Sequence, residues 1–166
     1  VESSDEVSVQ GEGRFLREAY VISRLQHPAV VPIYDRGVRP DGALYYTMKY
    51  VHGTTLEDHL DACKTLVERL GLLGHFAGVC QAVAYAHSQG IIHRDLKPRN
   101  VMIGEFGETV VLDWGIAKIR GELDPVSITN GFPTGHTDTY AVLGTPGYMS
   151  PEQALGATDR VDERTD

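Results

Sequence analysis

The chain has 166 residues, a length that suits one ordinary domain and excludes several stacked ones. Its 15 Lys and Arg residues against 23 Asp and Glu give a formal net charge of −8, which argues against a protein that binds along nucleic-acid phosphates. Hydrophobic residues make up 42% of the chain, yet no apolar run approaches the roughly 18 residues of a membrane-spanning helix, so the composition predicts a globular fold without membrane contact by this segment.

The first predicted helix covers residues 14–26 and carries Glu18. Before it, residues 1–13 are polar, rich in glycine and without a period, which is typical of a loop. Apolar side chains then recur at helical spacing, at Phe15, Ala19, Ile22 and Leu25. Pro28 ends the helix, because the residue before a proline avoids the α region.

Two β-rich segments follow, at residues 30–39 and 43–51. A Pro-Asp-Gly tripeptide at residues 40–42 joins them, so the sequence predicts an antiparallel hairpin. Thr55 and Asp58 then resemble a capping box, in which a threonine oxygen and a nearby acid satisfy the free N–H groups of a helix start. A short helix is therefore expected after Thr55.

A long, mostly buried helix is predicted over residues 65–89, where apolar positions advance by threes and fours. Gly90 follows at the position where a glycine commonly ends a helix. Cys63 and Cys80 have the spacing of neither a disulfide framework nor a zinc site, and we interpret them as reduced core thiols.

The remaining residues predict a second hairpin and a long loop. Residues 101–103 and 109–112 are β-rich and flank a glycine-containing turn. Residues 116–150 show no sustained period, and loops of such length usually serve a function.

The residues best suited to chemistry lie on the two sides of this second hairpin. Residues 93–100 read HRDLKPRN, and Asp113 follows the second strand. Because a hairpin returns its ends to one place, Asp95, Lys97, Asn100 and Asp113 are expected to share a site. Such a site suits phosphoryl transfer, since carboxylate and amide oxygens are ligands for Mg²⁺ and a second carboxylate can accept a hydroxyl proton.

The chain resembles the protein kinases, most of all the eukaryotic-like serine/threonine kinases of bacteria. Residues 93–100 are similar to the kinase catalytic loop without a mismatch, residues 113–115 (DWG) to the metal-binding DFG, and residues 150–152 (SPE) to APE. The resemblance implies the α+β, bilobal kinase fold. By this resemblance, residues 1–166 form a partial kinase domain with three parts. Residues 1–13 are a loop, residues 14–51 are a partial N-lobe with the hinge, and residues 52–166 are a partial C-lobe with the catalytic and activation loops.

The resemblance also assigns roles in ATP-dependent phosphorylation of serine and threonine. Asp95 would accept the substrate proton, Lys97 would balance charge on the moving phosphoryl group, and Asn100 with Asp113 would bind Mg²⁺. Glu18 would pair with the lysine that anchors ATP. The residues expected around the adenine are Met48, Tyr50, Val51 and Met102.

Further roles follow from the same resemblance. Thr137 and Thr139 are candidate phosphorylation sites of the activation loop, and Arg94 would pair with the phosphate. Thr145, in the segment that would face the substrate, is expected to hydrogen-bond Asp95 and Lys97. Asp166 would brace the catalytic loop.

The sequence departs from the family pattern in several places, among them Trp114 in place of phenylalanine and Ser150 in place of alanine. No Gly-rich loop and no Val-Ala-x-Lys strand precede Glu18, so we expect an internal fragment that is inactive alone and in which Glu18 has no partner. One open alternative is therefore a pseudokinase that binds nucleotide or serves as a scaffold. A second alternative is a small-molecule kinase of related fold, but residues 144–152 argue against it. The expected partners are protein substrates and a second kinase copy for trans-autophosphorylation. The segment is expected to be cytoplasmic, and a membrane anchor elsewhere in the parent protein stays open.

Overall fold

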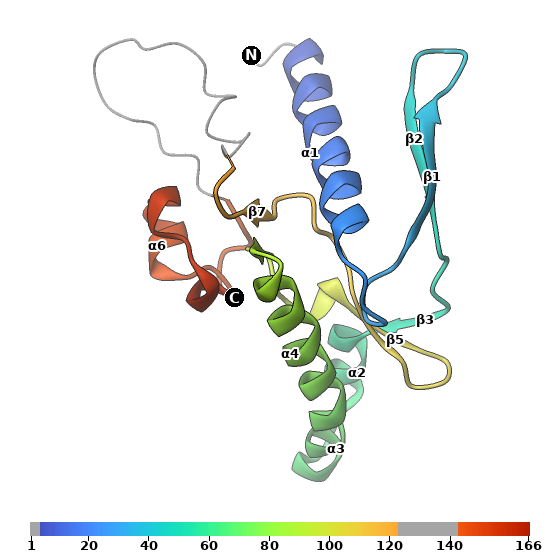
Figure 1. The fold of residues 1–166 in the computed structure, drawn as a ribbon. Helices are drawn as coiled ribbons and strands as arrows, with labels where there is room; N and C mark the ends of the chain where they lie inside the picture. Colours follow the sequence, from blue (N-terminus) through green and yellow to red (C-terminus); the bar gives the residue numbers. More distant parts are fainter. Residues whose placement is uncertain (1–3, 123–142) are drawn as a thin grey trace.

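The computed structural model describes residues 4–122 and 143–166 (Figure 1). The helices are α1 (Ser4–Arg24), α2 (Leu56–Ala62), α3 (Leu66–Gly71), α4 (Leu73–Ser88) and α6 (Pro151–Ala154), with the 3₁₀ turns Pro98–Asn100, Thr158–Arg160 and Glu163–Thr165. The strands are β1 (Ile33–Val38), β2 (Leu44–Met48), β3 (Gly53–Thr55), β4 (Ile91–Ile92), β5 (Val101–Gly104), β6 (Thr109–Val111) and β7 (Lys118–Ile119). Within these residues, no helix is both long and apolar enough to cross a membrane.

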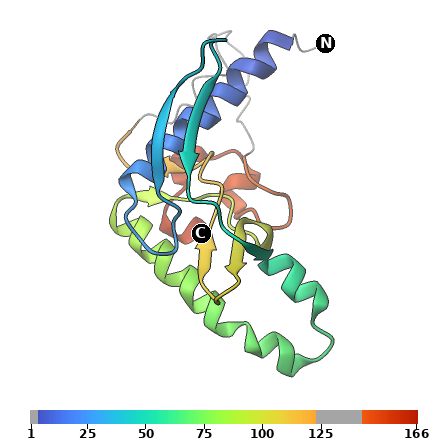
Figure 2. The ribbon, with the colours of Figure 1, turned by 90° about the vertical axis from the view of Figure 1, so that its right-hand side faces the viewer.

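The elements form two groups joined near the middle of the molecule. In Figures 1 and 2, α1 stands beside the β1–β2 hairpin at one end, and α2, α3 and α4 form the other end. The antiparallel sheet β3-β5-β6 lies between them, and a parallel bridge between Val30 and Val111 links the first group to this sheet. The predicted α+β class is confirmed.

Helix α1 begins at Ser4, so the loop predicted over residues 1–13 is wrong for residues 4–13. The two glycines of this stretch each cost about 1 kcal/mol of helix stability, but extending a helix that is already nucleated costs little more.

Both predicted hairpins are confirmed. Strands β1 and β2 pair antiparallel with Val38 opposite Leu44, and β5 pairs with β6 with Val101 opposite Val111. Strand β3, which the sequence analysis missed, adds to the other edge of β5. The capping box at Thr55 is confirmed, since its side chain accepts from the Asp58 N–H and Asp58 accepts from the Thr55 N–H.

The long helix predicted over residues 65–89 is two helices, α3 and α4, separated at Leu72. Gly71 ends α3, and glycine weakens a helix interior, so the chain breaks where glycines cluster. Gly90 adopts the expected left-handed conformation, with φ of +73°. The interpretation of core thiols is wrong for burial, because Cys80 is exposed and Cys63 is only half-buried, although both are free.

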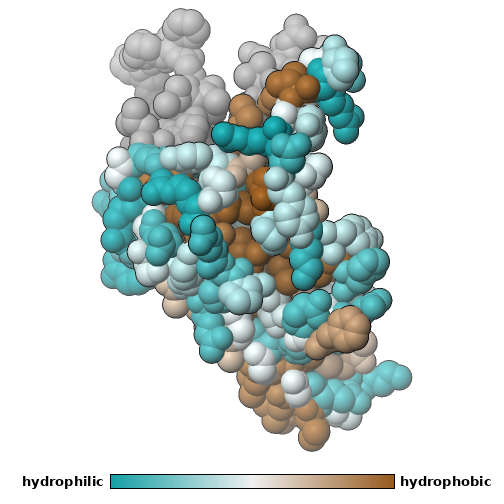
Figure 3. Space-filling view, turned by 45° about the vertical axis from the view of Figure 1, so that its right-hand side comes forward, coloured by the Kyte–Doolittle hydropathy of each residue, from teal (hydrophilic) through white to brown (hydrophobic). Residues whose placement is uncertain are grey.

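The buried core joins α1 and α4 to strands β4, β5 and β6. Its largest fully buried side chains are Trp114, Ile91, His93, Val21 and Val111. The surface at the end formed by α3 and the start of α4 is strongly apolar (Figure 3). Exposed side chains there are Leu66, Val67, Leu70, Leu73 and Phe76.

Candidate active site

The segment 93–100 is held at its start by one buried carboxylate. Asp166 accepts hydrogen bonds from the backbone N–H groups of His93 and Arg94, both at 2.8 Å, and its Oδ2 lies 2.9 Å from Nε2 of His87 on α4. Arg94 has φ of +70°, a conformation that costs energy in a residue other than glycine and persists where neighbours fix it. The predicted brace by Asp166 is thus present.

Replacing Asp166 by alanine is expected to lower the free energy of unfolding by about 2–5 kcal/mol, because two buried N–H groups lose their acceptor. Urea unfolding followed by tryptophan fluorescence measures the loss, with Trp114 as the single tryptophan of residues 1–166. Asp159→Ala is the matched control, since Asp159 is exposed and makes no side-chain hydrogen bond among the described residues. Equal stability of the two variants would contradict the assigned role of Asp166.

Asp95 is the centre of a hydrogen-bond network. Its Oδ2 accepts from Lys97 Nζ at 2.7 Å and from Asn100 Nδ2 at 3.1 Å, and its Oδ1 accepts from the Thr145 hydroxyl at 2.7 Å. Lys97 Nζ also donates to Thr145 Oγ1 at 2.6 Å. The expected contacts of Thr145 with Asp95 and Lys97 are therefore confirmed, and residues far apart in the chain meet at one carboxylate.

These contacts keep Asp95 ionised although its side chain is buried. Burial alone would raise the pKa of Asp95, but the hydrogen bonds from Lys97, Thr145 and Asn100 outweigh it and hold the pKa of this carboxyl below its ordinary value. A carboxylate that stays charged at neutral pH can accept a proton from a hydroxyl group placed beside it.

Replacing Thr145 by valine removes one of these donors and is expected to raise the pKa of Asp95. In the wild-type protein, the lowered pKa of Asp95 stabilises the fold at pH values above the ordinary pKa, and this contribution is lost as pH falls through the lowered pKa. Because the substitution raises the pKa of Asp95, any activity that needs the ionised carboxylate should be lost at a higher pH in the variant. At neutral pH, the rate of a reaction that uses the Asp95 carboxylate should fall by about tenfold, as expected for a lost hydrogen bond to a charged group. The pH–rate profile measures both effects, with Thr47→Val in the exposed part of β2 as control. An acid limb that stays in place would refute the link.

A buried residue that the sequence analysis missed ties this network to α6. The side-chain amide of Gln153 donates to the backbone oxygens of Arg94 at 2.6 Å and Leu143 at 3.0 Å. The only sequence signal for Gln153 is its position three residues after Ser150, because these two residues form a capping box at the start of α6. Gln153 therefore links residues 93–100 to the segment that carries Thr145.

Asp113 follows β6 and is positioned by its neighbour Trp114. The indole is fully buried, donates to Val111 O at 3.3 Å and lies with its ring centroid 4.6 Å from that of His93. Asp113 itself is exposed, with φ of +61°, and its Oδ1 accepts from the Gly115 N–H at 3.4 Å. The larger ring of tryptophan thus fits this position and anchors the turn.

His93 orients the loop from beneath. Its Nδ1 accepts from the Asp95 N–H at 3.2 Å, so Nε2 carries the proton and donates to Leu112 O at 3.0 Å. Burial lowers the pKa of His93, which favours this neutral form. The ring therefore connects the two segments that carry Asp95 and Asp113.

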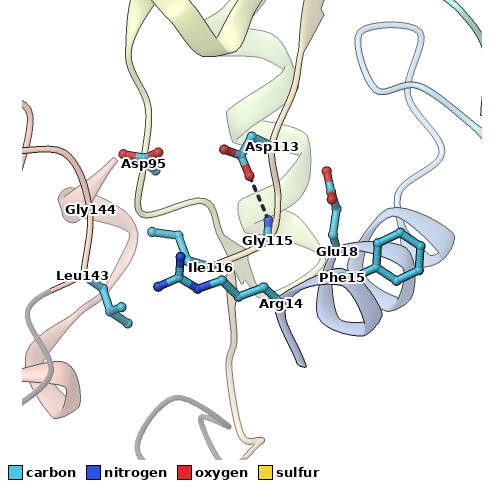
Figure 4. Close-up of a pocket in the computed structure, with 9 residues that line it drawn as sticks. All are labelled: Arg14, Phe15, Glu18, Asp95, Asp113, Gly115, Ile116, Leu143 and Gly144. Atoms are coloured by element: carbon cyan, nitrogen blue, oxygen red, sulfur yellow. Dashed lines mark hydrogen bonds between the residues drawn. The ribbon is translucent and has the colours of Figure 1, made fainter. Parts of the chain in front are cut away.

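The side chains of Glu18, Asp95 and Asp113 line one pocket of about 360 Å³ (Figure 4). Its remaining wall comes from Arg14, Phe15, Gly115, Ile116, Leu143 and Gly144. Asp113 offers an exposed carboxylate, and the amide oxygen of Asn100 accepts no hydrogen bond within the described residues. These are hard oxygen ligands of the kind that Mg²⁺ takes together with substrate phosphates and water. No cluster of three His, Cys, Asp or Glu suited to a metal occurs in the described part of the chain.

Glu18 has a partner, contrary to the expectation from the sequence. The Tyr46 hydroxyl, on β2, donates to Glu18 Oε2 at 2.8 Å. Burial and the negative charge of Asp113 both raise the pKa of Glu18, whereas the hydrogen bond from Tyr46 lowers it. The net effect is a pKa above the ordinary value for glutamate. The sequence analysis had interpreted residues 43–51 only as strand and hinge, and Tyr46 was missed.

The other predicted site residues are not brought into this pocket. Met48 and Tyr50 are exposed, Val51 and Met102 are half-buried, and none of the four lines the pocket of Figure 4. Arg94 is buried and its Nε donates to Ile116 O at 2.5 Å. Thr137 and Thr139 lie outside the described residues, so their phosphorylation stays a prediction.

Comparison with known proteins identifies similar chains. A model of the protein kinase domain matches residues 1–166. The serine/threonine-protein kinase PknD of Protochlamydia amoebophila (strain UWE25) is 42% identical over 161 residues, which cover 86% of this chain and 16% of that protein. The proteins of the same name from Chlamydia pneumoniae and Chlamydia muridarum (strain MoPn / Nigg) are 40% and 39% identical, over 86% and 92% of this chain. The chain spans only 17% and 18% of the length of those two relatives.

Proposed function

Because this chain belongs to the protein kinase family, we propose that the full-length protein containing it transfers the γ-phosphoryl group of ATP to serine and threonine hydroxyls of protein substrates. The observation that carries the proposal is the network at Asp95, where a lysine, an asparagine and a threonine converge on one carboxylate beside Asp113. Positioning and charge stabilisation provide most of the catalysis in this class of reaction.

Each residue of the network has a chemical task. Asp95, kept ionised, orients the substrate hydroxyl and accepts its proton. Lys97 lies 2.7 Å from Asp95 and stabilises negative charge on the transferred phosphoryl group. Asn100 and Asp113 would hold Mg²⁺, which supplies charge neutralisation on the ATP phosphates. The adenine would then lie toward Met48, Tyr50, Val51 and Met102.

Specificity for serine and threonine is supported by Lys97 and Pro98, because tyrosine kinases of this family usually carry alanine and arginine around these positions. Residues 1–17 hold neither a Gly-rich loop nor the Val-Ala-x-Lys strand, so residues 1–166 alone should be inactive. The PknD names support the same substrate class for the whole protein.

The experiment supplies the full-length protein with labelled ATP, Mg²⁺ and peptides that differ only in carrying serine, threonine or tyrosine. Label on serine and threonine, and none on tyrosine, is the expected result. Label on an added small-molecule alcohol but on no peptide would favour a small-molecule kinase. ATP binding without any transfer would favour the pseudokinase alternative.

A further inference from the structure

Tyr46 contacts α1 at two points, one turn of helix apart. Its hydroxyl donates to Glu18, and its ring lies against that of Phe15 with centroids 4.5 Å apart and planes inclined by 31°. Residues three apart on a helix lie on the same face, so Phe15 and Glu18 form one surface toward β2. Glu18 and Phe15 both project from α1 at the edge of the pocket in Figure 4.

The hydrogen bond from Tyr46 restricts the orientation of the Glu18 carboxylate, which also interacts with the backbone of Trp114. Its side chain is half-buried and shares the pocket with Asp113, whose negative charge repels it. Among the described residues, no lysine or arginine forms an ion pair with Glu18. Tyr46 is thus the side chain in this part of the chain that bonds the carboxylate.

The donor is neutral, which matters for the role of Glu18. Burial raises the pKa of Tyr46, and the nearby Glu18 raises it further, so the hydroxyl keeps its proton. A neutral donor fixes a carboxylate without cancelling its charge, whereas an arginine would compensate that charge. Glu18 can therefore be held in place and still attract a cation.

We propose that Tyr46 is a positioning residue for phosphoryl transfer, whose hydroxyl holds the carboxylate of Glu18 at the wall of the pocket that contains Asp95 and Asp113. The inference rests on the proposed function and deepens it. Tyr46 acts through Glu18, the one residue of the described chain that its hydroxyl bonds. Because Tyr46 lies on β2, it anchors α1 to β2 rather than to residues 93–100.

The neighbouring tyrosine offers a matched control. The Tyr45 hydroxyl also donates to a carboxylate, Asp35 Oδ2 at 3.3 Å, but across the β1–β2 hairpin and away from the pocket. Successive side chains of a strand point to opposite faces, which explains the different partners. Tyr46→Phe and Tyr45→Phe thus delete the same atom on opposite faces of one strand.

The experiment measures kcat and KM for ATP in the full-length protein. Tyr46→Phe should lower kcat/KM by about tenfold, as expected for the loss of a hydrogen bond to a charged group, while Tyr45→Phe should stay within about twofold. In a Glu18→Ala background, Tyr46→Phe should cause no further loss, because the group that it positions is gone. Equal losses in both backgrounds would indicate a merely structural role and overturn the proposal, as would wild-type kinetics of Tyr46→Phe.

A second readout separates this inference from the proposed function. In protein labelled with ¹³C-glutamate, the carboxyl signal of Glu18 should shift in Tyr46→Phe and stay in place in Tyr45→Phe. If the Glu18 signal shifts in a protein that binds ATP but transfers no phosphate, the contact between Tyr46 and Glu18 is supported and the proposed kinase activity is refuted. An unchanged Glu18 signal in Tyr46→Phe would refute the contact itself.

Discussion

Replacing Asp95 by asparagine is expected to lower the rate of phosphoryl transfer by about 10²–10⁴, the usual contribution of a general base. The carboxylate accepts from Lys97, Thr145 and Asn100, and these donors keep it ionised. An asparagine keeps the shape of the side chain but cannot take a proton from the substrate hydroxyl. Initial rates with saturating ATP and peptide measure the effect.

Binding of ATP controls for folding in the Asp95→Asn variant. In the proposed function Asp95 acts on the substrate hydroxyl and does not bind the nucleotide, so the dissociation constant for ATP should change by no more than about threefold, as for a substitution that spares the contacts of the ligand. A variant that binds ATP and still transfers phosphate at the wild-type rate would contradict the role of Asp95 as base.

Replacing Asp113 by alanine is expected to lower transfer by about a thousandfold or more, because charge stabilisation by a metal is worth several kcal/mol. The Asp113 carboxylate is exposed in the pocket, and its turn is fixed by the buried Trp114, so the substitution removes a ligand and leaves the anchor in place. Rates measured over a series of Mg²⁺ concentrations test this, since added Mg²⁺ should raise the wild-type rate and fail to rescue the variant.

Glu105→Ala is the matched control for Asp113→Ala. Glu105 is an exposed acid in the turn between β5 and β6, at the opposite end of the same hairpin, and it does not line the pocket. Its removal changes the net charge equally and should leave the rate within about twofold, as for surface substitutions away from a site. Wild-type rates and a normal Mg²⁺ dependence in Asp113→Ala would contradict the metal assignment.

The proximity of Asp95 and Asp113 was predictable because a single hairpin lies between the segments that carry them. Residues 93–100 and 113–115 flank this hairpin, and the pairing of β5 with β6 brings the two segments together. The contact of Thr145 with Asp95 spans fifty residues, and only the resemblance to a family with a known arrangement predicted it.

What could not be predicted depends on packing between distant elements. The partner of Glu18 is Tyr46, and their contact depends on how α1 lies against the β1–β2 hairpin, which no periodicity in either segment encodes. The start of α1 was placed ten residues late because glycines suggest a loop, whereas propagation of a helix overrides such local preferences. The break between α3 and α4 was missed because an apolar period continues across Gly71.

The most direct test of the central claim is transfer of labelled γ-phosphate from ATP to a generic protein substrate by the full-length protein, with Asp95→Asn prepared in parallel. The site around Asp95 and Asp113 predicts label on serine or threonine with the wild type and its loss in the variant. If the wild-type protein is folded and binds ATP with Mg²⁺ but transfers no label, the claim is contradicted and the chain is a nucleotide-binding scaffold.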